Sequence, residues 1–241
     1  MSLKMLKEEI KRELDINPHY REMLFRRGYL LTNAQIDDTV YPFYGIWAMT
    51  EVGPYKLYVQ EKQTFYTAKE GDLSVVIIGH AYNPFDMKWD ENALCRDLLN
   101  SYKKGLPTYF DRVSELTGLH VIILVDNNTV IECQDACSLT GCYFGKIDNN
   151  FYIAEHPQLI ADLCNLKIDP NVEKLVESKC YNIGNRHLPG NITPYKEIKR
   201  LGANTYVKYD GSFSVHRFYP ICPHPEFRTE EVTENAIKQI G

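Results

Sequence analysis

The chain has 241 residues, 44% of them hydrophobic and 24% charged, which is typical of folded soluble domains and excludes a mostly disordered protein. Its formal net charge of −5 argues against nucleic acid or an anionic membrane surface as the partner. We expect no membrane segment, no signal peptide and reduced thiols in a cytoplasmic protein, because no apolar run approaches the ~18–20 residues that span a bilayer and the seven cysteines form no CxxC pair.

The first part of the chain has the spacing of helices. Apolar residues recur every three or four positions over residues 3–15, which predicts an amphipathic helix with one apolar face: Leu3, Leu6, Ile10 and Leu14. A second, short helix is expected from Pro18 to a stop at Gly28. We therefore expect residues 1–40 to form a helical N-terminal extension.

Residues 41–220 alternate between groups of strands and groups of helices. The expected strands are 44–50, 55–61, 63–68, 73–80, 119–125, 129–134, 142–147, 150–154, 204–209 and 213–219. The expected helices are 91–104, a short one from Pro107, 157–165 and 170–178. Leu119–Val125 is apolar on both faces, so it should be a central, covered strand. This order predicts an α+β fold in which two antiparallel sheets lie between helix layers.

The last segment, 221–241, predicts a linker followed by a new helix. Thr229 is a suitable N-cap, and the residues after it form an apolar stripe of Val232, Ala236 and Ile240. We expect a further domain to begin here.

Motif searches exclude several kinds of site. The sequence contains no GxGxxG, GxxxxGK[ST], HExxH or GxSxG motif. Cys133, Cys137 and Cys142 could bind zinc only with a fourth ligand, and none is apparent, so we interpret them as buried apolar residues and expect no metal site. The seventeen tyrosines are interpreted as packing residues in strands rather than as a base-stacking surface.

Several segments occur in the order of motifs from one known family. They are Ile78-Gly79-His80-Ala81-Tyr82-Asn83, Leu116–Asp126, Leu139–Gly145 with Tyr152–His156, and Thr193–Leu201. In this order they resemble the N-terminal glutamine amidotransferase domain of asparagine synthetases over roughly residues 43–220. The resemblance implies the N-terminal-nucleophile hydrolase fold, a four-layer αββα sandwich. Residues 221–241 would then be the linker and the start of a truncated synthetase-like domain that uses ATP and Mg; no cofactor is expected in the residues before it.

The same resemblance implies a degenerate glutaminase site. The family needs an N-terminal cysteine as nucleophile and an oxyanion hole, but here Tyr44 lies at the nucleophile position and Ile78, without a donor, at the oxyanion position. The Gly79 N–H would remain as a donor.

Two further residues are candidate remnants of the substrate pocket. His80 replaces a glutamate that would hold the substrate amine, although a histidine hydrogen-bonded in the core is the simpler interpretation. Asp90 is the other candidate remnant, with a helix cap as the simpler interpretation.

Three functional hypotheses follow. The first is a glutaminase-inactive domain with a structural or docking role beside the synthetase-like domain of the same chain; β-lactam synthetases, which resemble asparagine synthetases, carry such a half without the cysteine. The second is a protein-binding or regulatory module that forms a homodimer or binds a protein partner through the N-terminal helices. The third is a residual glutamine amidotransferase activity in asparagine biosynthesis.

Overall fold

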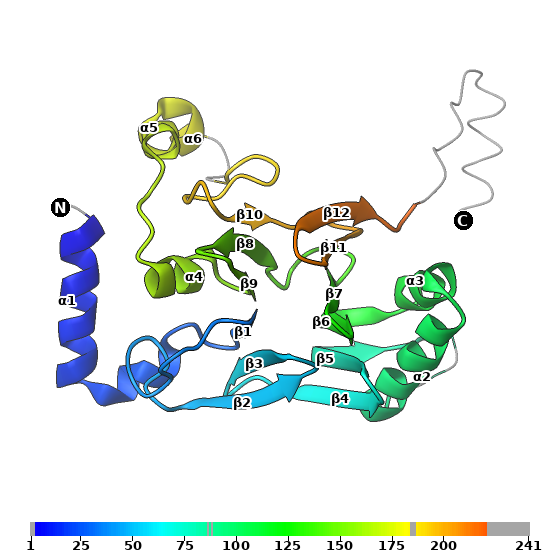
Figure 1. Ribbon diagram of the computed structural model, residues 1–241. Coiled ribbons are helices and arrows are strands. Elements are labelled where there is room, and N and C mark those ends of the chain that lie inside the picture. Colours follow the sequence, from blue (N-terminus) through cyan, green and yellow to red (C-terminus); the bar gives the residue numbers. More distant parts are fainter. Residues whose placement is uncertain (1–2, 86, 88, 184–186, 221–241) are drawn as a thin grey trace, which may run out of the picture.

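The computed structural model describes residues 3–85, 87, 89–183 and 187–220. Within them the chain forms an α+β fold with two antiparallel six-stranded sheets, six α-helices and one 3-10 helix (Figure 1). The expected C-terminal linker and helix, residues 221–241, lie outside the described residues.

Each sheet collects strands from distant parts of the sequence. The first sheet has the order β10-β8-β9-β1-β3-β2 and contains β1 (Tyr29–Thr32), β2 (Trp47–Val52), β3 (Tyr55–Gln60), β8 (Tyr143–Ile147), β9 (Asn150–Ala154) and β10 (Lys199–Arg200). The second has the order β12-β11-β7-β6-β5-β4 and contains β4 (Phe65–Glu70), β5 (Leu73–Tyr82), β6 (Thr117–Asp126), β7 (Thr129–Gln134), β11 (Thr205–Tyr209) and β12 (Phe213–Arg217).

The expected central strand, 119–125, is confirmed by β6, which pairs with β5 on one side and β7 on the other. Its side chains alternate between two cores, as the strand period of two requires. Val121 and Ile123 belong to a core shared with Leu31 of the first sheet, so the two sheets pack face to face. Ile122 and Leu124 belong to a second core on the other face, which the helices cover.

Helices cover the outer faces of both sheets. Two of them, α2 (Glu91–Lys103) and α3 (Leu106–Ser114), pack on the second sheet through apolar residues such as Leu94, Leu98 and Phe110 (Figure 1). On the first sheet, α4 (Pro157–Cys164) packs through Leu159 and Ile160. Two short helices, α5 (Pro170–Glu177) and α6 (Lys179–Ile183), follow.

The expectation that residues 1–40 contain only helix and loop is wrong at β1. This strand lies inside the first sheet, paired with β9 on one side and β3 on the other, and all four of its residues are buried. The run Tyr-Leu-Leu-Thr is apolar on both faces and only four residues long, so it has no alternation by which a strand is recognised. The first sheet therefore begins before residue 41.

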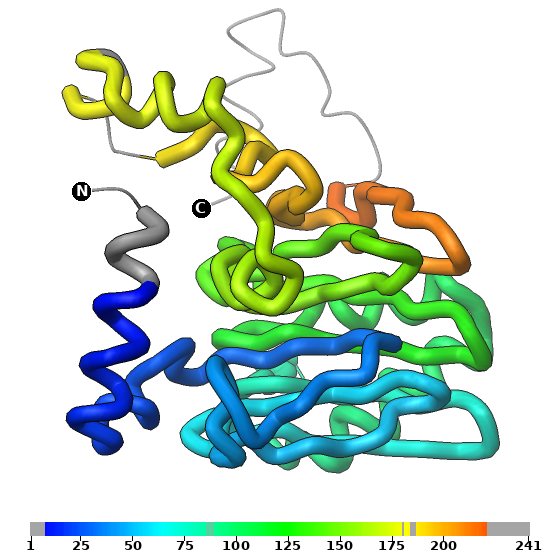
Figure 2. The backbone as a smooth tube through the Cα atoms, turned by 60° about the vertical axis from the view of Figure 1, so that its left-hand side comes forward, coloured from blue at the N-terminus to red at the C-terminus, as the bar shows by residue number. Residues whose placement is uncertain are grey.

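Helix α1 (Leu3–Ile16), the first described element of the chain, stands apart from both sheets (Figures 1 and 2). It confirms the predicted amphipathic helix, and the 3-10 helix η1 (Pro18–Met23) follows it. Leu14 is buried, but Ile10 and Ile16 are 41% and 63% exposed. Within the described residues, no helix combines the length and the apolar character that crossing a membrane requires.

Candidate functional site

The first residue of β1 lies beside the last residues of β3, at one end of these strands in the first sheet. We call this region around the start of β1 the β1 edge, although β1 itself is a central strand. Tyr29, the first residue of β1, is in register with Val59 near the end of β3. The adjacent Gln60 is fully buried, and its amide oxygen accepts hydrogen bonds from the N–H groups of Arg27 at 3.2 Å and Lys62 at 2.9 Å. This amide fixes the chain at the entry to β1 and at the exit from β3.

Tyr44, the candidate nucleophile position, lies in a turn before the edge strand β2 and not at the start of a strand as expected. Its φ is 51°, and its ring lies 4.3 Å from the guanidinium carbon of Arg21 and 6.0 Å from the ring of Tyr41. Burial raises the pKa of the phenol above its usual value. A protonated phenol is a poor nucleophile at neutral pH.

Ile78 and Gly79 lie near the end of β5. The Ile78 side chain is buried in the core between the sheets and carries no hydrogen-bond donor. The Gly79 N–H donates to the backbone carbonyl of Thr64 at 2.9 Å, so this donor is already in use. Gly79 has a φ of 92°, and a Cβ on it would lie 2.3 Å from the carbonyl oxygen of Leu119. The glycine is explained by this close backbone approach.

His80 contacts the start of α2 through Glu91, the residue that directly follows Asp90. The His80 side chain is 72% exposed, and its Nδ1 lies 3.2 Å from Oε1 of Glu91. The interpretation of His80 as a core residue is therefore wrong. Asp90 caps α2, since its carboxylate accepts from the Asn92 N–H at 2.9 Å. The helix-cap interpretation of Asp90 is confirmed.

A buried polar cluster at the β1 edge has no counterpart in the sequence analysis. The Tyr29 hydroxyl donates to Oε1 of Glu132 at 2.5 Å and contacts the carbonyl oxygen of Gly141 at 3.2 Å. The thiol of Cys142 also hydrogen-bonds to Glu132. Burial raises the pKa of Glu132 to about 7, although both hydrogen bonds favour its charged form. Its second oxygen has no partner.

A second carboxyl, that of Glu155, lies beside this cluster. Burial raises its pKa to about 7, against the opposing effect of Arg27. Glu155 also raises the pKa of Tyr29, which places its charge close to the phenol. Burial lowers the pKa of the adjacent His156. The β1 edge thus combines two carboxyls of raised pKa with a phenol and a thiol.

The thiols described here are poorly suited to nucleophilic catalysis. Burial raises the pKa of Cys95 to about 12 and raises that of Cys133 and Cys142 still further. Because the thiolate is the reactive form, such thiols are inert. Cys137 is exposed, whereas Cys133 and Cys142 lie in cores on opposite faces of the second sheet. In the described part of the chain, no group of three or more metal-ligating side chains occurs.

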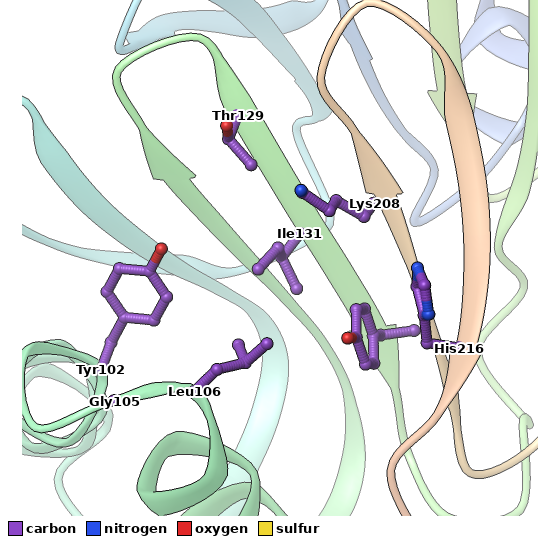
Figure 3. Close-up of a pocket in the computed structure, with 8 residues that line it drawn as sticks. Tyr102, Gly105, Leu106, Thr129, Ile131, Lys208 and His216 are labelled. Carbon is purple, nitrogen blue, oxygen red and sulfur yellow. The ribbon is translucent and has the colours of Figure 1, made fainter.

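An open groove of about 500 Å³ lies outside the second sheet, beside the turn between α2 and α3 (Figure 3). Three of its polar side chains already have partners. The Tyr102 hydroxyl donates to Asp126 at 3.1 Å, and Lys208 pairs with Asp210 at 2.8 Å. His216 stacks on a tyrosine ring of β11 and contacts a serine hydroxyl. The arrangement contains no nucleophile with an adjacent base.

Comparison with known proteins gives a likeness of fold only. No family model matches the sequence, and no curated protein matches it. Among solved structures, the chain is similar to glutamine phosphoribosylpyrophosphate (PRPP) amidotransferase from B. subtilis complexed with ADP and GMP, with a TM-score of 0.45, 9% identity, and coverage of 83% of this chain and 45% of that one. It is also similar to a structure described as the allosteric regulatory enzyme of purine biosynthesis, with a TM-score of 0.46, 8% identity, and coverage of 84% and 45%. The chain thus spans less than half the length of either protein, and no residue role is transferred from them.

Proposed function

We propose that this chain is a glutaminase-inactive, glutamine-amidotransferase-like domain of an asparagine-synthetase-like ligase that forms amides with ATP and Mg in the cytoplasm. The domain has a structural or docking role beside the synthetase-like domain. The α+β fold with two antiparallel six-stranded sheets supports this proposal. The proposal rests on the sequence resemblance and on the groups found at Tyr44, Ile78 and Gly79.

The observation that carries the proposal is that neither a thiol nor an amide donor stands at the two positions that the resemblance assigns to the nucleophile and the oxyanion hole. Tyr44 offers a phenol held beside Arg21 instead of a thiol. Ile78 offers an apolar side chain instead of an amide donor, and the Gly79 N–H is occupied by Thr64. Removing a single oxyanion donor typically costs ~10²–10³ in rate, and the missing thiol removes the covalent route.

A second glycine gives the same conclusion. Gly28 directly precedes β1, and a Cβ on it would lie 2.7 Å from the carbonyl oxygen of Phe25. The residue before this glycine is Arg27, just as the residue before Gly45 is Tyr44. Whichever glycine corresponds to the family's Cys-Gly pair, the residue before it carries no thiol.

The segment with the most specific resemblance makes structural contacts. The hydroxyl of Thr193 is buried, lies 2.8 Å from the carbonyl oxygens of Tyr195 and Ile198, which share its one proton, and accepts from the Tyr195 N–H at 3.1 Å. The Leu201 N–H then donates to the carbonyl of Cys142 at 2.9 Å. These contacts join the segment to β8, which supports a retained scaffold rather than a retained glutamine site.

The test is glutamine hydrolysis by the purified chain. Glutamate release is measured by a coupled dehydrogenase assay, with an active glutaminase as positive control and circular dichroism as the check of folding. The protein is also incubated with 6-diazo-5-oxo-L-norleucine, which alkylates glutaminase nucleophiles, and its intact mass is measured. We expect no turnover above buffer and no added mass. Turnover together with one alkylated residue would replace this proposal with the residual amidotransferase activity.

A second candidate function is supported by α1. Ile10 and Ile16 on this helix are 41% and 63% exposed, and the helix stands apart from both sheets (Figure 2). An amphipathic helix with an exposed apolar face can dock on a protein partner or on a second copy of the chain. In this alternative, the N-terminal helices make the chain a protein-binding or regulatory module.

The oligomeric state tests this alternative. Sedimentation is compared between the whole chain, the variant Ile10→Lys and the control Lys11→Glu, which changes a neighbouring charge. Self-association that Ile10→Lys abolishes and the control retains supports docking through α1. Monomers in all three samples would contradict the homodimer form of this alternative.

A further inference from the structure

The inner face of β5 and β6 continues past the core that lies between the two sheets. The side-chain period of two puts His80 and Tyr82 on the same face of β5 as Ile78. It likewise puts Leu119 on the same face of β6 as Val121. Ile78 and Val121 are buried in the core between the sheets, whereas Leu119 is 54% exposed and the His80 side chain is 72% exposed. The cover from the first sheet therefore ends between these neighbouring positions.

The surface beyond this cover groups several exposed apolar side chains. Leu119 is the register partner of His80 across the two strands. Trp89, just before α2, is 62% exposed, and its ring stacks on that of Tyr82 with the centroids 5.0 Å apart and the planes 10° apart. We call these four residues, His80, Tyr82, Trp89 and Leu119, the β5–β6 overhang. Exposed apolar side chains that lie together, unlike scattered ones, mark a surface that binds another segment or molecule.

The described part of the chain ends close to this surface. Tyr219 lines a cavity of about 190 Å³ together with Leu116, the residue directly before β6. Leu119 follows three positions later, which is about 10 Å along an extended strand. The chain therefore leaves the described fold at the same end of β6 that carries the overhang.

The sequence that follows supplies an apolar stripe of its own. Residues 221–241 lie outside the described residues, and the stripe expected over 229–240 consists of Val232, Ala236 and Ile240. Residues 221–228, at ~3.3 Å per extended residue, can span ~26 Å. This reach exceeds the separation along the strand between the chain exit and Leu119. The tether therefore allows the stripe to meet the overhang.

We propose that the segment 229–240 docks its apolar stripe on the β5–β6 overhang of its own chain. This segment is favoured over a separate molecule, because a short tether holds it beside the surface at a high effective concentration. The stripe covers Leu119 and Trp89, and the stacked rings of Tyr82 and Trp89 give it a flat, preordered contact. None of these residues lies at the candidate nucleophile or oxyanion position, so this docking is independent of the proposed function.

The fluorescence of Trp89 tests the docking in the full chain. The chain has two tryptophans, and the other one, Trp47, is only 6% exposed. Acrylamide quenching is compared between the wild type and the double variant Val232→Asp/Ile240→Asp, which places two charges on the stripe. The control Lys238→Asp changes the net charge by the same two units on the opposite side of the expected helix.

We expect the double variant to raise the quenching constant at least threefold and the control to leave it unchanged. The same comparison with Trp89→Phe added should show no difference, because the reporter is then absent. Equal quenching in the wild type and the double variant would overturn the proposal. An equal rise in the Lys238→Asp control would also overturn it.

A variant on the described surface tests the other side of the contact. Leu119 is exposed, so Leu119→Asp should keep the circular dichroism spectrum of the wild type and raise the quenching of Trp89 as the double variant does. Unchanged quenching in folded Leu119→Asp would contradict docking on the overhang. Shielding of Trp89 that is lost on dilution would overturn the proposal in favour of a second copy of the chain.

Discussion

Glu132 should make the stability of this protein fall as the pH rises. Its carboxyl is fully buried, and burial raises the pKa from 4.5 to about 7. Between these two values the unfolded chain has lost the proton and the folded chain keeps it, so the free energy of unfolding decreases with rising pH. Above about pH 7 both states are ionised and the decrease stops. A shift of 2.5 units at ~1.36 kcal/mol per unit gives about 3 kcal/mol over this window.

The variant Glu132→Gln isolates this effect. Glutamine cannot ionise, and its amide oxygen can still accept from the Tyr29 hydroxyl, which now lies 2.5 Å from Oε1. Urea unfolding followed by circular dichroism at pH 5, 6, 7 and 8 gives the free energy of unfolding of both proteins. The free energy of unfolding of the variant minus that of the wild type should increase by up to about 3 kcal/mol as the pH rises from 5 to 8.

An exposed carboxyl provides the control for the loss of one charge. Glu51 lies exposed on the edge strand β2, and Glu51→Gln makes the same chemical replacement at a site that is not buried. We expect the free energy of unfolding of Glu51→Gln to differ from that of the wild type by a nearly constant amount across the same pH range. A constant difference in the free energy of unfolding for Glu132→Gln as well would refute the reasoning from burial.

Three further predictions concern single positions. Gly79→Ala should lower the free energy of unfolding by at least about 2 kcal/mol, because the added Cβ meets the Leu119 carbonyl at a positive φ; unchanged urea midpoints would contradict this geometry. Asp90→Ala should lower the free energy of unfolding by about 1 kcal/mol, because the Asn92 N–H loses the carboxylate that caps it. Asp90→Asn should retain most of the stability in urea or thermal unfolding, and equal losses in both variants would exclude a capping role. Iodoacetamide with peptide mapping should label Cys137 first among Cys95, Cys133, Cys137, Cys142 and Cys164, because it is the exposed one; faster labelling of a buried thiol would indicate an activated cysteine.

The long regular elements were predictable because each has its own local signal. The strand at Leu119–Val125 is apolar apart from His120, and both faces of β6 are covered over Val121–Val125, as expected. Helix α2 has an apolar face and a capping aspartate, Asp90, at its start. Such signals depend on neighbours within a few residues, so they survive without knowledge of the tertiary fold.

The candidate site was less predictable because its geometry depends on distant contacts. Tyr29 and Glu132 are 103 positions apart, and no local pattern pairs them. One signal was available, a charged residue inside the otherwise buried strand β7. The positive φ of Gly79 likewise depends on the backbone of Leu119 across the sheet. The sequence predicts a strand from Tyr44 because the segment is rich in Tyr, Val, Ile and Thr, but Tyr44 lies in the turn before β2.

Because β1 lies inside the first sheet, its position determines how far the chain can be truncated from the N-terminus without disrupting that sheet. Neighbouring strands lie ~4.8 Å apart, so without β1 its partners β3 and β9 would face each other across about 10 Å, beyond hydrogen-bond reach. Two rows of backbone groups would then be free to pair with other molecules. An expression boundary at residue 41 is therefore expected to yield aggregates, whereas one at Asn17 removes α1 and leaves the first sheet whole. The amino-terminal segment is thus in part a core element of the fold, and only α1 is separable from it.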